Sequence, residues 1–208
     1  MVEDYSTEEQ QVEAIKKFWK ENGTAIILGA VIGLGGLWGW RYYNEQRVAS
    51  QEQASEQYEQ AITMLEQGEQ GFDEAKRFVS ENPDNHYAAL AAMQLAQQAV
   101  ELDNLEEAAA QLKLAADKAG VDALASVARL RLARVQIQQQ AYEEALTTLA
   151  SVEAQSYKSQ VLELQGDVYV AQEKLDQARS AYSEALQLNA GNNLLKMKLD
   201  NLQVLASL

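Results

Sequence analysis

The sequence predicts an all-α protein: a single N-terminal transmembrane helix followed by an α-solenoid of helical repeats. Three observations lead to this fold class. An uncharged, largely apolar stretch runs from residue 22 to residue 40. The rest of the chain is rich in Ala, Leu, Gln and Glu and has one proline, a composition that favours helices. Pairs of small residues twelve positions apart recur three times along the chain, which indicates a repeat.

Residues 1–21 are predicted to be a cytoplasmic tail with a short amphipathic helix. Its apolar residues recur at helical spacing, at Val12, Ile15, Phe18 and Trp19. Three lysines precede the apolar stretch and two arginines follow it, a count that favours a cytoplasmic tail. Because a large domain can cross a membrane regardless of such charges, this count alone leaves the opposite orientation open.

Residues 22–43 are predicted to form the transmembrane helix. At a rise of ~1.5 Å per residue the uncharged part spans roughly 27–29 Å, close to the ~30 Å of a bilayer core. Aromatic residues at both ends suit the membrane interfaces. Two GxxxG pairs predict close contact with another membrane helix, the alternative being the ordinary glycine content of such helices. The pairs are Gly29 with Gly33 and Gly35 with Gly39.

A buried soluble helix and a cleaved signal peptide are the competing interpretations of this stretch. Five glycines would weaken a soluble helix by about 0.5–1 kcal/mol each. A signal peptide needs small residues at a cleavage site after the apolar run, whereas Trp40 and Arg41 lie there. The membrane anchor is therefore the better interpretation.

Residues 44–70 are predicted to be a linker helix entering the repeat domain, ended by Gly68 and Gly71. Residues 71–208 are predicted to be the repeats with a C-terminal capping helix. A turn is expected at 103–104, and Asp122 is expected to cap the helix after Gly120. The small-residue pairs are Ala96/Ala108, Ala133/Ala145 and Gly166/Ala178. Successive pairs are offset by 37 and then 33 residues. A weaker unit before them pairs Tyr58 and Ala61 with Ala75 and Phe78.

The pattern resembles the tetratricopeptide repeat, most clearly over residues 159–190. That unit carries a small residue and a tyrosine in its first helix, Gly166 and Tyr169. Its second helix carries Ala178, Tyr182 and Ala185. Small residues let the two helices of a hairpin cross closely, and large ones fill the space to the next hairpin. An irregular helical bundle is the alternative.

No set of residues predicts catalysis, a cofactor or a metal site. His86 is the only histidine and the chain has no cysteine, so metal and nucleophile motifs lack their partners. Carboxylate pairs such as Glu106/Glu107 and Glu143/Glu144 suit solvated helix starts. A net charge of −14 argues against nucleic acid as a partner. We therefore expect a non-enzymatic protein.

The first helix of each repeat is predicted to turn a partly apolar face toward a concave groove. An exposed apolar groove usually marks a binding surface, although these residues could instead pack on neighbouring helices. The candidate groove residues are Leu90, Met93, Val100, Val127, Leu130, Arg134, Ile137, Glu163, Asp167 and Val170.

Residues 11–23, the glycine-rich anchor and residues 39–43 together resemble the YfgM-type family of ancillary SecYEG translocon subunits. The repeat segments 88–98 and 129–135 are similar as well. The resemblance implies a single-pass protein of the bacterial inner membrane with a cytoplasmic N-terminus and a periplasmic repeat domain. It also implies association with the SecYEG translocon and with a membrane-anchored periplasmic chaperone of the peptidyl-prolyl isomerase class.

Two functions follow as hypotheses. In the first, the chain is an adaptor at the translocon whose repeat domain links secreted or membrane proteins to periplasmic chaperones. In the second, it is a membrane-anchored regulator whose cytoplasmic residues 1–20 bind a soluble signalling protein such as a response regulator. A purely structural scaffold for envelope assembly is a third interpretation.

Overall fold

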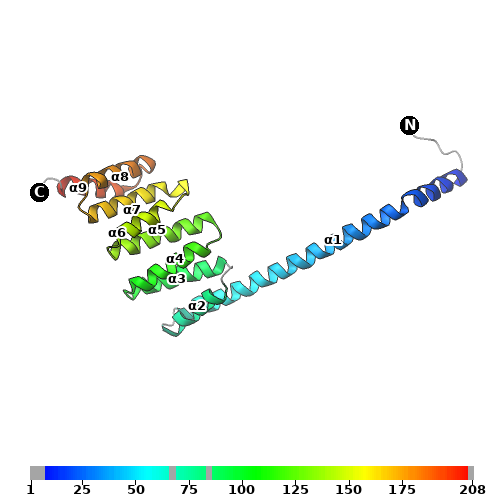
Figure 1. Ribbon diagram of the computed structural model, residues 1–208, viewed down its shortest axis with the longest axis horizontal. Coiled ribbons are helices and arrows are strands. Elements are labelled where there is room, and N and C mark those ends of the chain that lie inside the picture. The colour runs from blue at the N-terminus through cyan, green and yellow to red at the C-terminus, as the bar shows by residue number, and fades with distance from the viewer. Residues whose placement is uncertain (1–7, 66–68, 83–85, 206–208) are drawn as a thin grey trace. The chain divides into compact units, whose positions relative to one another are not determined.

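The computed structural model describes residues 8–65, 69–82 and 86–205. Every regular element within these ranges is helical, which confirms the all-α prediction (Figure 1). The chain divides into two compact units, Met1–Gln53 and Ala54–Leu208. The α-helices are α1 (Glu8–Leu65), α2 (Glu69–Glu81), α3 (His86–Glu101), α4 (Leu105–Lys118), α5 (Asp122–Gln138), α6 (Tyr142–Ala150), α7 (Lys158–Ala171), α8 (Leu175–Leu188) and α9 (Asn193–Leu205), with a 3-10 turn at Gln155–Tyr157.

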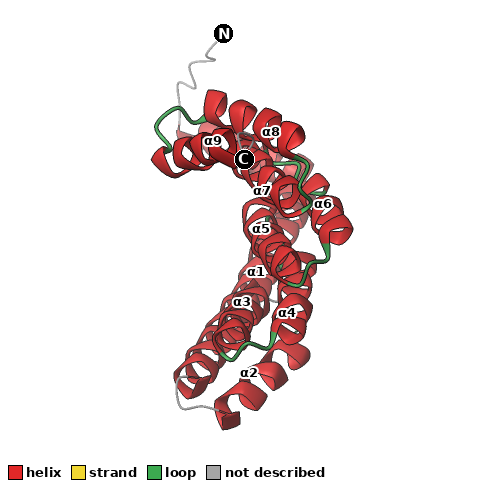
Figure 2. Ribbon diagram, turned by 90° about the vertical axis from the view of Figure 1, so that its left-hand side faces the viewer, coloured by secondary structure: helices red, strands yellow, loops and turns green. Residues whose placement is uncertain are grey.

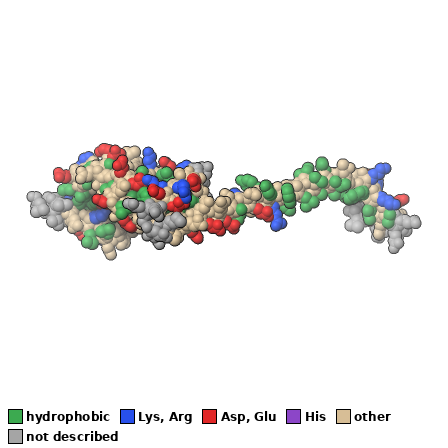
Figure 3. Space-filling view, turned by 90° about the horizontal axis from the view of Figure 1, so that it is seen from below, with side chains coloured by type: hydrophobic (Ala, Val, Ile, Leu, Met, Phe, Trp, Pro, Cys, Tyr) green, Lys and Arg blue, Asp and Glu red, His purple; other side chains and the backbone are tan. Residues whose placement is uncertain are grey.

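The first unit consists of the helix α1 as far as Gln53. The helix runs without a break through the segments predicted as tail helix, anchor and start of the linker. It is long and apolar enough to cross a membrane by length and composition. Figure 3 shows apolar side chains along its middle, with basic side chains toward both ends of that stretch. The predicted tail begins outside the described residues, at positions 1–7.

The last turns of α1 belong to the second unit and form its first hairpin with α2. Ala61, Ala75 and Phe78 lie in one buried core, and the Tyr58 ring packs against the Phe78 ring at 6.3 Å between centroids. This contact confirms the weaker repeat unit expected from the sequence. The expected break differs: α1 ends at Leu65, Gly68 lies outside the described residues, and Gly71 is buried within the first turn of α2.

Three further hairpins, α3–α4, α5–α6 and α7–α8, stack in order. Figure 2 shows α3, α5 and α7 in one row and α4, α6 and α8 in the other. The paired small residues are buried where the two helices of each hairpin cross: Ala96, Ala108, Ala133, Ala145, Gly166 and Ala178. A methyl group on Gly166 would stand 2.3 Å from Cε1 of Tyr182, so any larger residue at this crossing would require the Tyr182 ring to shift. The twelve-residue spacing therefore marks real crossing points.

The same turn closes each of these hairpins, although the sequence identified only the first. Asp103, Gln140 and Glu173 have φ of 58°, 62° and 60°. They are offset by the same 37 and 33 residues as the small-residue pairs. In each turn two backbone N–H groups donate hydrogen bonds to carbonyl groups of the preceding helix, as in a Schellman cap. In the α5–α6 hairpin, for example, the N–H of Ala141 donates to the Gln136 carbonyl at 2.8 Å.

The connection between α4 and α5 differs in one detail from the expectation. Gly120 has φ +65°, and the ring of His86 occupies the space that a Cβ there would need. Asp122 does not cap α5, because it is already the first helical residue and Val121 takes the cap position. The main-chain carbonyl of Asp122 instead accepts a hydrogen bond from Ser126 Oγ at 2.7 Å.

The helix α9 covers the apolar face that α8 leaves at the end of the stack. Leu195 and Leu202 are fully buried there, in a core that also contains Leu162 and Tyr182. A solenoid needs such a terminal helix because its last repeat has no neighbour to cover it.

Candidate functional site

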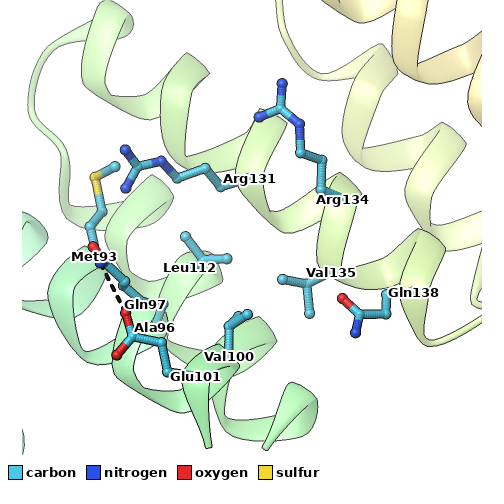
Figure 4. A pocket seen from close by; sticks show the side chains of 10 residues that line it. All are labelled: Met93, Ala96, Gln97, Val100, Glu101, Leu112, Arg131, Arg134, Val135 and Gln138. Carbon is cyan, nitrogen blue, oxygen red and sulfur yellow. Dashed lines mark hydrogen bonds between the residues drawn. The ribbon is translucent and has the colours of Figure 1, made fainter. Parts of the chain in front are cut away.

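Three of the predicted groove residues line one cavity between neighbouring repeats. Met93 and Val100 come from α3, and Arg134 comes from α5. The cavity has a volume of about 410 Å³, within the range of ordinary ligand sites. We call it the α3–α5 cavity; its lining, drawn in Figure 4, is Met93, Ala96, Gln97, Val100, Glu101, Leu112, Arg131, Arg134, Val135 and Gln138.

Helical spacing explains why these residues meet. On α5, Arg131 and Arg134 lie one turn apart and Gln138 lies one turn further, so all three share a face. On α3, Gln97 and Val100 share the facing side. Leu112 on α4 and Val135 on α5 are buried beneath them and provide an apolar floor.

The rim of the α3–α5 cavity carries charge on both sides. Glu101 lies on the α3 side and accepts a hydrogen bond from Gln97 Nε2 at 3.2 Å. On the α5 side, Arg131 and Arg134 are exposed and form no hydrogen bond or ion pair with any described residue. Figure 4 shows both guanidinium groups extending from α5 on the side away from Val100 and Gln138.

Other predicted groove residues pack between helices. Leu130 is 5% exposed and lies with Ile137 in the core between α5 and α7, against Val161. Val127 packs against the core of the first hairpins. Leu90 on α3 is half-buried. The first helices of the repeats lie side by side (Figure 2), so the side of α5 that carries Leu130 and Ile137 packs against α7.

Glu163 and Asp167 meet a side chain from the capping helix. Lys198 Nζ donates to Glu163 Oε1 at 2.8 Å and to Asp167 Oδ1 and Oδ2, both at 2.8 Å. The Tyr182 hydroxyl donates to Asp167 Oδ1 at 2.6 Å. We call these four residues the cap network. The tenth predicted residue, Val170, packs in the adjacent core. At this end of the stack, α9 occupies the predicted groove.

The cap network favours the protonated forms of its two proton donors. Burial and the hydrogen bond to Asp167 raise the pKa of Tyr182 far above its usual value. Burial by itself would lower the pKa of Lys198, but its bonds to Asp167 and Glu163 outweigh that effect and leave it raised. The network is therefore an electrostatic link between α7 and α9.

The glycines of the predicted helix–helix contact have no side-chain neighbour among the residues that the structure describes. A Cβ on Gly29, Gly33, Gly35 or Gly39 would meet nothing within 4 Å. At 3.6 residues per turn the pair Gly29/Gly33 and the pair Gly35/Gly39 lie about 120° apart around α1. They form two separate small-residue surfaces, and contact of either with another helix stays a prediction.

The sequence prediction missed Arg131 in the α3–α5 cavity. A signal for it was present, because Arg131 lies three residues before the predicted Arg134 and helical spacing puts both on one face. Leu112 was harder to find, because it lies on the second helix of its hairpin and reaches the cavity from below.

A second cavity of about 460 Å³ lies between α4, α5 and α6. Its lining includes Lys113, Arg129 and Thr147. Arg129 is on the same helix as Arg131 and Arg134 but lines this other cavity, which makes it a useful comparison.

A family model described as a tetratricopeptide repeat-like domain matches residues 16–204. The ancillary SecYEG translocon subunit of Escherichia coli (strain K12) is 37% identical over 207 residues, covering 98% of this chain and 100% of that protein. The ancillary SecYEG translocon subunit of Haemophilus influenzae is 34% identical over 198 residues, covering 94% and 97%.

Solved structures of similar fold include MamA, residue 41 to the end, from Desulfovibrio magneticus RS-1. It has a TM-score of 0.59 at 17% identity and covers 74% of this chain and 85% of that one. A structure of PilF from Pseudomonas aeruginosa has a TM-score of 0.58 at 20% identity and covers 76% and 71%. At these identities the structures indicate the fold alone, and with the family model they confirm the predicted tetratricopeptide-like repeats.

Proposed function

The chain belongs to the family of ancillary SecYEG translocon subunits, and from this premise we propose that it is a non-enzymatic, single-pass membrane adaptor associated with that translocon. In this proposal its repeat domain lies in the periplasm and links secreted or membrane proteins to a membrane-anchored chaperone of the peptidyl-prolyl isomerase class. The observation that carries the proposal is the combination, in one chain, of an exposed apolar helix and a repeat domain with an open cavity between two of its repeats.

The apolar side chains of α1 support a membrane anchor. Leu28 is 61% exposed, Val31 63% and Leu34 68%, and similar exposure extends around the helix. Each such side chain would gain about 1.5–3 kcal/mol on leaving water, so a bilayer is the environment that suits this segment. The two small-residue surfaces, Gly29 with Gly33 and Gly35 with Gly39, are then the proposed contacts with helices of the translocon or of the chaperone.

The orientation with the repeat domain in the periplasm has two supports. The three lysines before the anchor exceed the two arginines that follow it. The family resemblance implies the same orientation. A fusion of an alkaline phosphatase to the C-terminus tests it: we expect phosphatase activity, and an inactive fusion would contradict the orientation.

An anchored repeat domain acts by proximity. Tethering two partners to one membrane protein makes their encounter intramolecular, and short tethers give effective concentrations of about the millimolar range. The adaptor then needs only modest affinity at its groove, which fits an open cavity better than a deep one.

Photo-crosslinking in intact membranes tests the adaptor function. A photoreactive residue replaces the exposed Val100 in the α3–α5 cavity, or the exposed Thr147 in the second cavity as a matched control. We expect crosslinks to a periplasmic chaperone or an exported chain from Val100 and not from Thr147. Equal crosslinking from both positions would contradict a specific groove. Leu130 and Ile137 are unsuitable sites because they support the core.

One observation favours the tail as a second binding region. Ile15, Phe18 and Trp19 are 67%, 57% and 55% exposed on the described part of the tail. Replacing residues 1–20 with an unrelated sequence separates the two functions. If periplasmic capture survives and a signalling phenotype disappears, the tail carries regulation through a soluble partner such as a response regulator. If neither changes, the regulatory hypothesis fails.

A further inference from the structure

The α3–α5 cavity combines an apolar floor with two arginines that have no acidic partner among the described residues. We propose that this cavity binds an extended segment of a partner protein in which an apolar residue lies between two acidic residues. The inference rests on the proposed function, because it names the chemistry of the partner that the groove accepts.

Charge complementarity identifies the acidic part of the ligand. The chain has a net charge of −14, so two neighbouring unpaired arginines are a local exception on an acidic molecule. A guanidinium group binds a carboxylate through two parallel hydrogen bonds and is well suited to recognise it. Because this protein is acidic overall, it would bind the phosphate backbone of a nucleic acid poorly. The carboxylates of a protein segment are therefore the anions that suit the two arginines.

The spacing of the arginines identifies the conformation. Arg131 and Arg134 are three residues apart on α5, so their Cβ atoms lie about 5–6 Å from each other. Alternate residues of an extended chain lie about 6.6 Å apart on one side, a close match that flexible arginine side chains can adjust. Two acidic residues at positions i and i+2 can therefore meet the two arginines together.

The residue between the two acidic positions then points to the opposite side of the extended segment. At the α3–α5 cavity that direction leads to the apolar floor formed by Leu112, Val135 and the side chain of Met93. A side chain such as Leu or Val would bury its surface there, and a volume of about 410 Å³ has room for it.

Glu101 fixes the orientation of the segment. It lies on the opposite rim from the arginines and would repel a carboxylate placed beside it. The acidic residues therefore lie along α5, and the backbone N–H groups on the other edge of the segment face Gln97 and Glu101. Replacing Glu101 with Gln removes the repulsion, so this variant should bind the acidic segment more tightly.

The test uses the full-length protein in detergent micelles and fluorescein-labelled synthetic peptides, with binding measured by fluorescence anisotropy. The first peptide is Gly-Ser-Glu-Leu-Glu-Ser-Gly. Three matched peptides replace both Glu residues with Gln, both with Lys, or the Leu with Ser. We expect saturable binding of the first peptide and binding at least about tenfold weaker for each of the others, because each lacks one of the complementary groups.

Two double variants separate the arginines from general charge. Arg131→Gln with Arg134→Gln should weaken binding of the first peptide at least about tenfold. Lys113→Gln with Arg129→Gln changes the net charge equally at the second cavity and should leave binding unchanged. Arg131, Arg134 and Lys113 are exposed, and Arg129 is half-buried where it lines the second cavity, so thermal unfolding midpoints should stay close to the wild-type value.

Equal binding of the acidic and the Lys peptides would overturn the proposal. The proposal would also be overturned if the double variant at Arg131 and Arg134 binds the first peptide as tightly as the wild type. Equal losses of affinity in the two double variants would overturn it as well. These failures differ from failure of the proposed function. If Val100 still crosslinks specifically in membranes, the groove has a partner of different chemistry; if that crosslink is absent as well, the adaptor function itself is refuted.

Discussion

Lys198 forms the ion pairs between α9 and α7, and replacing it tests how much they add to the apolar packing at the end of the solenoid. The Nζ atom lies 2.8 Å from oxygens of both Glu163 and Asp167. Lys198→Met keeps an unbranched side chain of similar length and similar helix propensity, so it removes the charge while largely preserving the packing of the stem. The variant leaves two half-buried carboxylates without a counter-charge.

The expected cost is about 2–3 kcal/mol of unfolding free energy. Hydrogen bonds to charged groups contribute about 1.5–3 kcal/mol, and breaking a fully buried pair costs about 3–5 kcal/mol. The side chains of Lys198, Glu163 and Asp167 are 26%, 17% and 26% exposed, so solvent screens part of the upper figure. A repeat protein loses contacts locally, so most of the effect should fall on α9 and α8.

Two measurements on the full-length protein in detergent check this prediction. Urea unfolding followed by circular dichroism gives the free energy, and hydrogen exchange of α9 amides shows where protection is lost. Lys196→Met is the matched control, because Lys196 is exposed on the same helix and its loss should change stability by less than about 0.5 kcal/mol. If Lys198→Met destabilises no more than Lys196→Met, the reasoning is refuted.

Three other predictions concern the repeats. Gln140 has φ +62°, a conformation that glycine adopts without strain, so Gln140→Gly should raise the unfolding free energy by about 0.5–1 kcal/mol. Its neighbour Gln139 has φ −73°, so Gln139→Gly should lower the unfolding free energy. Urea denaturation of the two variants distinguishes these outcomes. Gly166→Ala should lower the unfolding free energy by about 1–3 kcal/mol in the same assay, since the new Cβ would lie 2.3 Å from Cε1 of Tyr182. An unchanged or higher unfolding free energy would show that the Tyr182 ring moves aside easily. Folding raises the pKa of Tyr182 and of Lys198 above their usual 10.0 and 10.5, so their contribution to stability is complete below about pH 10 and is lost as pH rises further. The thermal midpoint should therefore fall above pH 10 by more in the wild type than in a Tyr182→Phe, Lys198→Met double variant, and equal losses would contradict this.

Much of the fold could be predicted because it depends on contacts close in the sequence. Ala96 and Ala108 meet across one hairpin, and their twelve-residue spacing recurs in the α5–α6 and α7–α8 hairpins because each crossing needs two small residues. The turn at Gln140 was less visible. Nothing in its side chain signals a positive φ, and only the common offset from Asp103 reveals it.

The candidate site was predicted in part for a related reason. Arg134 and Met93 reach the α3–α5 cavity because helical spacing alone brings them to the inner face. Leu130 shares that spacing and is buried, because α7 packs against that side of α5. The pattern of a single helix cannot show which of its sides the next repeat will cover, since that depends on the packing of two repeats.

The sequence by itself determined the apolar segment at residues 22–40, the helical class and the repeat, because each follows from periodicity and composition over short stretches. The tertiary structure decided which faces stay open. Lys198 lies 31 residues beyond Asp167, and only the packing of α9 against the α7–α8 hairpin brings them together and closes that end of the groove. Between α3 and α5 no described helix covers Arg131 and Arg134, and within the described chain neither arginine forms an ion pair.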